Sequence, residues 1–164
     1  MPLHWPKWDI DPAGKRGVGI ADSILLKPGK LNEEEFLVMK SHTTIGAATL
    51  ESVHQQYPHN AFVAMGIDIA RHHHERWDGS GYPERLAGEA IPLSARIMAL
   101  VDVYDALRAR RPYKEPFSHE RALTIIEEEN GRLFDPRLVQ AFRSVQHQFD
   151  AVCQRLADSM WFAS

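Results

Sequence analysis

Three consecutive histidines lie near the middle of the chain, within the stretch ARHHHERWDGSGYP at residues 70–83. Histidine is the most common metal ligand among protein side chains, and carboxylates complete many sites for divalent cations. The same stretch carries acidic residues and a glycine-rich turn, which lets a loop backbone approach a ligand closely. These residue types indicate a metal centre, provided that other segments bring further ligands to it.

One such segment is a helix predicted from about Asn32 to about Gln55. Asn32 is followed three residues later by Glu35, which is the spacing of a capping box at a helix start. His42 falls on the inner face of this helix, together with apolar residues that recur at helical spacing. A lone inward histidine is usually a hydrogen-bonded core residue, so His42 indicates a metal only in combination with the other histidines.

The histidine run itself falls at the end of a second helix, predicted from about His59 to Glu75. His73 continues the apolar stripe of this helix, and His74 points about 100° away from it because each residue turns an α-helix by that angle. Two adjacent histidines can therefore serve two neighbouring metals, or one metal and a substrate. His72 faces the opposite side, and we predict that it is incidental.

A third helix, predicted over about Leu93–Arg108, contains the sequence IMALVDVYDAL, which is apolar almost all round and so predicts burial. Asp102 and Asp105 lie one turn apart within it. Because an isolated buried charge is very costly, buried carboxylates must be paired, hydrogen-bonded or metal-bound. Coincidence is a poor explanation for histidines on two helices together with acids on a third. We therefore expect these side chains to converge on one cavity.

The remaining sequence fits one all-α domain. Ser118 is predicted to cap a helix that ends near Gly131, and Asp135 is predicted to cap a last helix that begins at Pro136. We assign residues 1–21 to an irregular N-terminal arm, residues 22–157 to the helical domain and residues 158–164 to a tail.

The bulk composition excludes several classes of protein. The chain has 164 residues and a formal net charge of −3, which argues against a general nucleic-acid binder. No apolar run reaches the roughly 18–20 residues of a transmembrane helix, and the N-terminus lacks a signal-peptide core. The single cysteine, Cys153, cannot form an intramolecular disulfide. We expect a cytoplasmic protein that has no membrane or nucleic-acid partner.

The segment HHERWDGSGYP, residues 73–83, resembles the GYP signature of the HD-GYP family, an all-helical branch of the HD phosphohydrolases. The resemblance extends over about residues 18–142, through DSILLKPGKL, MKSHTTIGA, IPLSARIMALVDVYDAL, RRPYK and FDPRLV. It implies an HD-domain-like bundle of about five helices. It also implies a bacterial phosphodiesterase that opens cyclic di-GMP with two or three metals, often iron or manganese.

The resemblance carries roles onto individual residues by matching position. The implied metal ligands are His42, His73, His74 and Asp102. Asp102 and Asp105 are the implied catalytic acids, with Asp105 supporting the site from behind the ligands. Arg111 and Lys114 of the RRPYK segment are implied to hold substrate phosphates. Tyr82 can stack or hydrogen-bond, and is a further candidate for substrate binding.

The sequence departs from the family in the His-Asp pair that gives the family its name. Two possible alignments place Ala13-Gly14 or Asp11-Pro12 at these positions, and the helices that precede the pair have no counterpart. We therefore expect an N-terminally truncated bundle with one metal site or none, and weak or lost hydrolysis. Without the preceding helices, apolar surface of the bundle should be exposed. Such a surface predicts a homodimer.

Two functions remain open on this basis. The first is a metal-dependent phosphodiesterase acting on cyclic di-GMP or a related phosphodiester. The second is a non-catalytic signalling module that binds the dinucleotide, or docks GGDEF-type partner proteins through the GYP loop, residues 77–92. A gene fragment without an independent role is a third, weaker interpretation.

Overall fold

A computed structural model describes residues 19–109 and 115–161, and within these ranges the chain is all-α, as the sequence predicted. It forms seven α-helices and one 3₁₀-helix, η1, where about five helices were expected. The bounds are α1 Asp22–Leu25, α2 Glu33–Lys40, α3 His42–Gln56, α4 Ala61–His72, η1 Gly88–Ala90, α5 Leu93–Arg108, α6 His119–Glu128 and α7 Pro136–Trp161. No helix in the described part of the chain combines the length and apolar character needed to cross a membrane.

The helix predicted over residues 32–55 is divided at Ser41 into α2 and α3. The predicted capping box is present, since Asn32 accepts the backbone N–H of Glu35 while the Glu35 carboxylate accepts that of Asn32. At the division, Ser41 and Thr43 donate their hydroxyl groups to carbonyls three residues earlier, at 2.6 and 2.9 Å. Such back-bonding competes with regular helix geometry and bends helices. The division makes His42 the first residue of α3.

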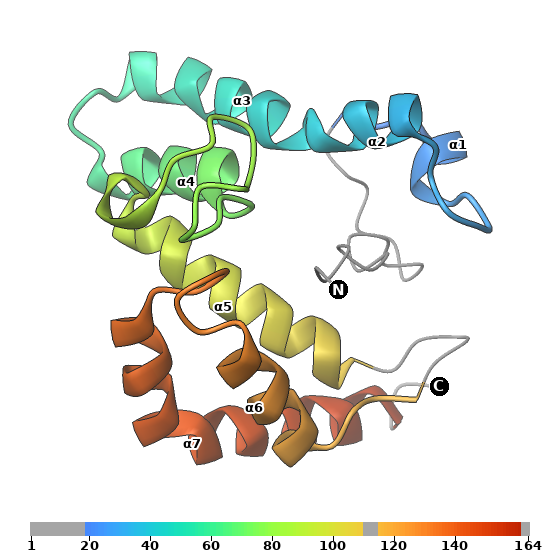
Figure 1. Cartoon of the computed structure of the whole chain (residues 1–164). Coiled ribbons are helices and arrows are strands. Elements are labelled where there is room, and N and C mark those ends of the chain that lie inside the picture. Colours follow the sequence, from blue (N-terminus) through green and yellow to red (C-terminus); the bar gives the residue numbers. More distant parts are fainter. Residues whose placement is uncertain (1–18, 110–114, 162–164) are drawn as a thin grey trace.

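Helices α3 and α4 pack side by side and form the upper layer of the molecule in Figure 1. The Asn60 side chain caps α4 by accepting the backbone N–H groups of Phe62 and Val63. This helix ends at His72, three residues before the predicted end. His73 is its C-cap and His74 lies in the turn that follows.

Helix α5 connects this layer to α6 and α7, which lie below it in Figure 1. The largest buried cluster fills the space between these three helices, with Tyr104 and Leu107 of α5 packed among residues such as Ile126, Phe134 and Phe142. A smaller cluster joins α1 to α2. The α5 helix therefore packs against both layers and joins them.

The expectation that α5 is buried on all sides was wrong. Its fully buried residues are Ala95, Ala99, Leu100, Tyr104 and Leu107. Asp102 and Asp105 are exposed, and so are the apolar side chains of Leu93 and Ile97. Apolar composition does not reveal how many sides of a helix its neighbours cover. The two acids are consequently not forced into contact with a metal by burial.

The last helix begins as predicted. Pro136 is its first residue, and the Asp135 carboxylate accepts the backbone N–H of Arg137 at 2.9 Å. The same carboxylate also binds the half-buried Arg96 of α5 at 2.7 Å. Helix α7 continues to Trp161, beyond the predicted domain end at residue 157. The predicted N-terminal arm, up to residue 18, and residues 162–164 of the tail lie outside the described residues.

Asp135 is predicted to contribute strongly to stability, because one carboxylate both caps α7 and neutralises Arg96. Replacing Asp135 with Ala should lower the free energy of unfolding by about 3 kcal/mol, since it removes a cap and leaves a guanidinium without its partner. Urea denaturation measures this loss. The matched variant Asp135→Asn keeps a capping acceptor and should lose clearly less. Equal losses in the two variants would contradict the assigned double role.

Candidate metal centre

Three imidazole rings meet where α3 begins and α4 ends. His42 comes from the first turn of α3, whereas His73 and His74 come from the C-terminal end of α4. Each ring offers a nitrogen, and these atoms lie within 4.8 Å of one another. The structure thus brings together the three histidines singled out in the sequence. His72 is buried but is not part of this cluster.

Backbone carbonyl groups fix the orientation of two of these rings. The Nδ1 atom of His42 donates to the Met39 carbonyl at 2.7 Å, and that of His73 donates to the Ile69 carbonyl at 2.8 Å. Since a carbonyl oxygen can only accept, each Nδ1 carries the hydrogen and each Nε2 of the neutral ring keeps a lone pair. Metal-binding histidines in proteins are oriented in the same way.

The spacing of the two Nε2 atoms fits a shared cation. They lie 3.4 Å apart, with no hydrogen available between them in these tautomers. Two nitrogens bound to one tetrahedral metal at about 2.0–2.1 Å are separated by roughly 3.3–3.4 Å. The cluster therefore has the ligand type and the spacing to hold one divalent cation.

The surroundings also keep two of the rings in the form that binds metals. Burial, followed by the neighbouring His42, lowers the pKa of His73 to about 4. Burial, with the additional influence of His73 and His42, holds the pKa of His74 well below its usual value. Both rings are neutral at pH 7, so no proton has to leave them when a cation binds.

Tyr82 of the GYP loop covers one side of the cluster. Its ring is stacked on that of His74, with the centroids 4.9 Å apart and the planes inclined by 24°. The Tyr82 backbone N–H donates to the His74 carbonyl at 3.2 Å. The Tyr82 ring also lies in a T-shaped arrangement with the ring of Phe36 of α2, with the centroids 6.4 Å apart. The Tyr82 ring therefore lines one side of the site and lies between the site and α2.

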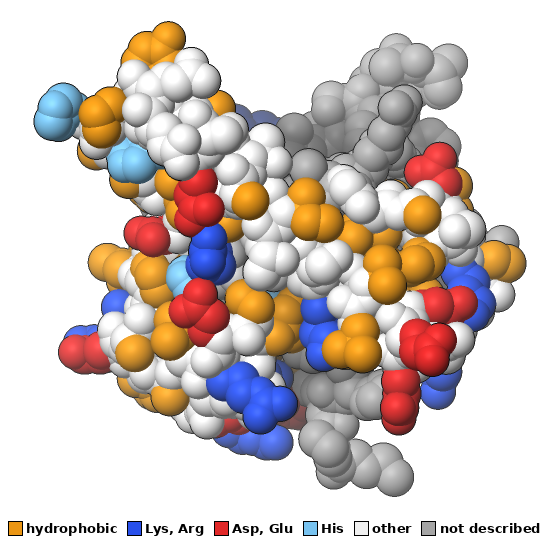
Figure 2. Space-filling model, turned by 90° about the horizontal axis from the view of Figure 1, so that it is seen from above, with side chains coloured by type: hydrophobic (Ala, Val, Ile, Leu, Met, Phe, Trp, Pro, Cys, Tyr) orange, Lys and Arg blue, Asp and Glu red, His pale blue; other side chains and the backbone are white. Residues whose placement is uncertain are grey.

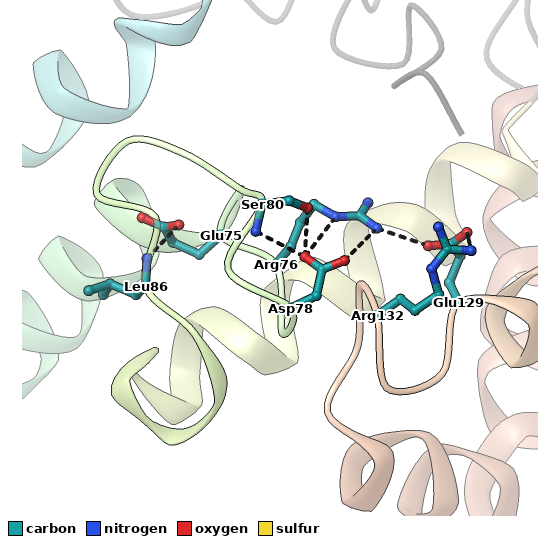
Figure 3. Close-up of polar contacts among 7 residues, drawn as sticks. All are labelled: Glu75, Arg76, Asp78, Ser80, Leu86, Glu129 and Arg132. Carbon is teal, nitrogen blue, oxygen red and sulfur yellow. Dashed lines mark hydrogen bonds and ion pairs between the residues drawn. The ribbon is translucent and has the colours of Figure 1, made fainter. Parts of the chain in front are cut away.

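Glu75 fixes the position of the loop by hydrogen bonds to its backbone. The side chain of Glu75 has no exposed surface. Its two carboxylate oxygens accept the backbone N–H groups of Glu84 and Leu86 at 2.7 and 3.1 Å. Figure 3 shows the bond from Leu86. Gly81 passes so close to the chain that a Cβ atom there would lie 2.4 Å from the backbone nitrogen of Arg76. Only glycine allows this approach.

A second set of contacts fastens the loop to the turn between α6 and α7. Arg76 donates to Glu129 at 3.1 Å and contacts Asp78 at 3.4 Å, and both Arg76 and Glu129 are buried (Figure 3). The backbone N–H groups of Trp77 and Asp78 donate to carbonyls of residues 132–133. Glu75 and Arg76 were not predicted from the sequence. Their position directly after the histidines was the available clue, but Glu129 is 53 residues away.

The remaining predicted site residues are not part of the three-histidine cluster. Asp102 and Asp105 lie on α5 with exposed side chains, and the grouped ligand atoms among the described residues do not include Asp102. Its role as a ligand stays a prediction. Arg111 and Lys114 lie outside the described residues.

The low pKa of His73 predicts how the stability of the metal-free protein depends on pH. The unfolded chain takes up this proton near pH 6.5, whereas the folded protein resists it down to about pH 4. The free energy of unfolding should therefore be highest above about pH 6.5. It should decrease as the pH falls toward 4, and the protonation of this ring should account for about 2–3 kcal/mol of the decrease. Chemical denaturation in the presence of a chelator should show a shallower pH dependence for His73→Gln. Identical slopes would contradict the assignment.

Glu75 is expected to determine the shape of the loop. Replacing it with Gln presents an amide N–H₂ to at least one backbone N–H, and should cost about 1–3 kcal/mol because a buried donor loses its acceptor. Thermal or urea unfolding measures the loss. Glu84→Gln is the matched control, since that side chain is exposed. A loss for Glu84→Gln as large as that for Glu75→Gln would contradict this role.

Comparison with known proteins identifies relatives of this chain by sequence. A family profile described as an HD domain matches residues 17–138. A cyclic di-GMP phosphodiesterase from Vibrio cholerae is 53% identical over 142 residues, which cover 87% of this chain and 29% of that protein. A cyclic di-GMP phosphodiesterase response regulator from Xanthomonas campestris is 50% identical over 136 residues, covering 83% and 35%. A 3'3'-cGAMP-specific phosphodiesterase from Vibrio cholerae is 41% identical over 141 residues, covering 86% and 26%.

The likeness to solved structures is more distant. A cyclic GMP-AMP-specific phosphodiesterase from Vibrio cholerae superposes with a TM-score of 0.49 and 24% identity, covering 92% of this chain and 40% of that one. The chain spans about a third of the length of the curated relatives it matches. The profile match covers most of the chain, and the GYP signature lies beside the three imidazoles. The chain belongs to the HD-domain family of metal-dependent proteins, in its HD-GYP branch.

Proposed function

We propose that this domain binds one divalent metal and acts on, or binds, cyclic di-GMP or a related phosphodiester, with weak or lost hydrolysis. The observation that carries the proposal is the pair of Nε2 atoms of His42 and His73, held 3.4 Å apart with their lone pairs free. The names of the relatives support the substrate class, because they include enzymes for cyclic di-GMP and for 3'3'-cGAMP. A cytoplasmic location is part of this proposal.

The protein's own residues would provide the following chemistry. His42, His73 and His74 would hold the metal, with Asp102 as a further ligand, and iron or manganese is the proposed ion. A bound cation of this kind activates water and neutralises charge on a phosphoryl group. The carbonyl groups of residues 39 and 69 orient the imidazoles, and Tyr82 excludes water from one face of His74.

The substrate would be held by further charged groups. Arg111 would offer a planar fork to a phosphate, and Lys114 a point charge. Asp105, one turn after Asp102 on α5, would support the site from outside the ligand set. These roles follow from matching position in the family.

The expectation of weak hydrolysis rests on the ligands that the sequence does not supply. The positions of the family's His-Asp pair are occupied by Ala13-Gly14 or Asp11-Pro12, which lie outside the described residues. Two metals that share a water need ligands that bridge them, whereas three imidazoles and one carboxylate are the complement of a single site. We therefore propose one metal and slow turnover.

A docking role is the alternative, and the fixed shape of the GYP loop favours it. The loop is held by Glu75 and by the pairing of Arg76 with Glu129, while several of its side chains between residues 78 and 90 are exposed. A rigid exposed loop loses little entropy when a partner binds. A GGDEF-domain protein is the proposed partner in this case.

A homodimer is also part of the proposal. Apolar side chains of α2 and α5 are exposed, including Leu37 at 61% and Leu93 at 54%. Figure 2 shows hydrophobic side chains dispersed among charged ones on the face seen from above, rather than gathered in one band. The proposed dimer therefore rests on the exposed apolar side chains of α2 and α5, which a second copy of the chain would cover, and not on a continuous apolar patch.

Metal content and turnover, measured on the same preparations, test the proposed function. Protein loaded with manganese or ferrous iron should hold about one equivalent of metal and hydrolyse cyclic di-GMP slowly. His73→Ala should lose both properties, whereas His147→Ala, on the exposed side of α7, should keep both. Two equivalents with fast turnover would contradict the single-site proposal. Less than half an equivalent without turnover would favour the docking role.

A further inference from the structure

Lys40 occupies an unusual place between two aromatic rings. It belongs to the last turn of α2, two residues before His42. Its ammonium nitrogen lies 5.2 Å from the centre of the Phe36 ring and 5.8 Å from the centre of the Tyr82 ring. Both distances are within the range in which a ring face attracts a cation. The two rings therefore hold the charged end of this side chain where α2 meets the GYP loop.

This position adjoins the imidazole cluster. The Tyr82 ring that contacts the Lys40 ammonium is the ring that is stacked on His74 at 4.9 Å. The edge contact between Phe36 and Tyr82 keeps the two holding rings together. A single aromatic ring thus separates the positive charge of Lys40 from the candidate metal centre.

No acid within residues 19–109 and 115–161 pairs with the ammonium of Lys40. The residues three and four positions away on its helical face are Phe36, Leu37, Thr43 and Thr44, none of which is acidic. Lys40 forms no ion pair within the described ranges, whereas Lys27 pairs with Glu35 at 2.6 Å. The end of a helix suits a cation, but it does not require two rings to hold the ammonium beside the imidazoles.

We propose that Lys40 is an anion-binding residue of this site, and that its ammonium, held by Phe36 and Tyr82, binds a phosphate group of the ligand. The identity of the ligand as a cyclic dinucleotide rests on the proposed function. Such a ligand carries two phosphodiester groups, so one can lie at the metal centre while another group meets Lys40. An ammonium held in place also loses less entropy when it binds than a freely moving one.

Binding measurements on matched variants test this role. Lys40→Met keeps the packing against the rings and removes the charge, Lys40→Arg restores the charge, and Lys30→Met removes an exposed charge elsewhere. In calorimetric titration of the manganese-loaded chain with cyclic di-GMP, Lys40→Met should weaken binding about tenfold and reduce its dependence on salt. Lys40→Arg should recover most of the affinity. Metal content should not change, and any kcat should stay within about threefold while KM rises.

The outcomes distinguish this inference from the proposed function. Binding by Lys40→Met within twofold of the unmodified protein, or an equal loss in Lys30→Met, would overturn the role of Lys40. If the unmodified protein does not bind cyclic di-GMP at all, the proposed substrate is wrong. The same variants are then titrated with inorganic pyrophosphate, for which the Lys40 site still predicts weaker binding in Lys40→Met. No difference in that titration would overturn the role of Lys40.

Discussion

The whole site depends on two imidazole nitrogens that face each other with their lone pairs free. Backbone carbonyls take the Nδ1 hydrogens of His42 and His73, so their Nε2 atoms meet at 3.4 Å without a hydrogen between them. Without a cation, no hydrogen bond joins the two Nε2 atoms. A divalent metal would bind both lone pairs and so stabilise the arrangement. The low pKa of His73 has a different cause, chiefly the burial of its ring and secondly the neighbouring His42.

The remainder of the fold can be understood as the support for these rings. The division at Ser41 begins a new helix at His42, and the early end of α4 places His73 and His74 beside it. The loop that follows is fixed by Glu75 within and by Arg76 against the turn between α6 and α7. Hydrogen bonds and a buried ion pair thereby connect the site to the largest core cluster, which lies between α5, α6 and α7.

Features encoded by neighbouring residues could be predicted from the sequence, and features set by distant contacts could not. The capping residues Asn32 and Asp135 act within one helical turn, and both helix starts were predicted correctly. The division at Ser41 depends on hydroxyl groups that compete with the helix. The exposure of Asp102 depends on which helices cover α5, and the burial of Arg76 depends on an acid 53 residues away. His42 was predicted within one longer helix, and the packing of α3 on α4 brings it to the end of α4, where His73 and His74 lie.

X-ray absorption on the zinc-loaded chain tests the central claim most directly, because it reports the ligands of the ion itself. We expect imidazole nitrogens at about 2.0–2.1 Å from the metal, with a smaller imidazole contribution after His73→Ala. A metal shell of oxygen atoms alone, without imidazole scattering, would contradict it.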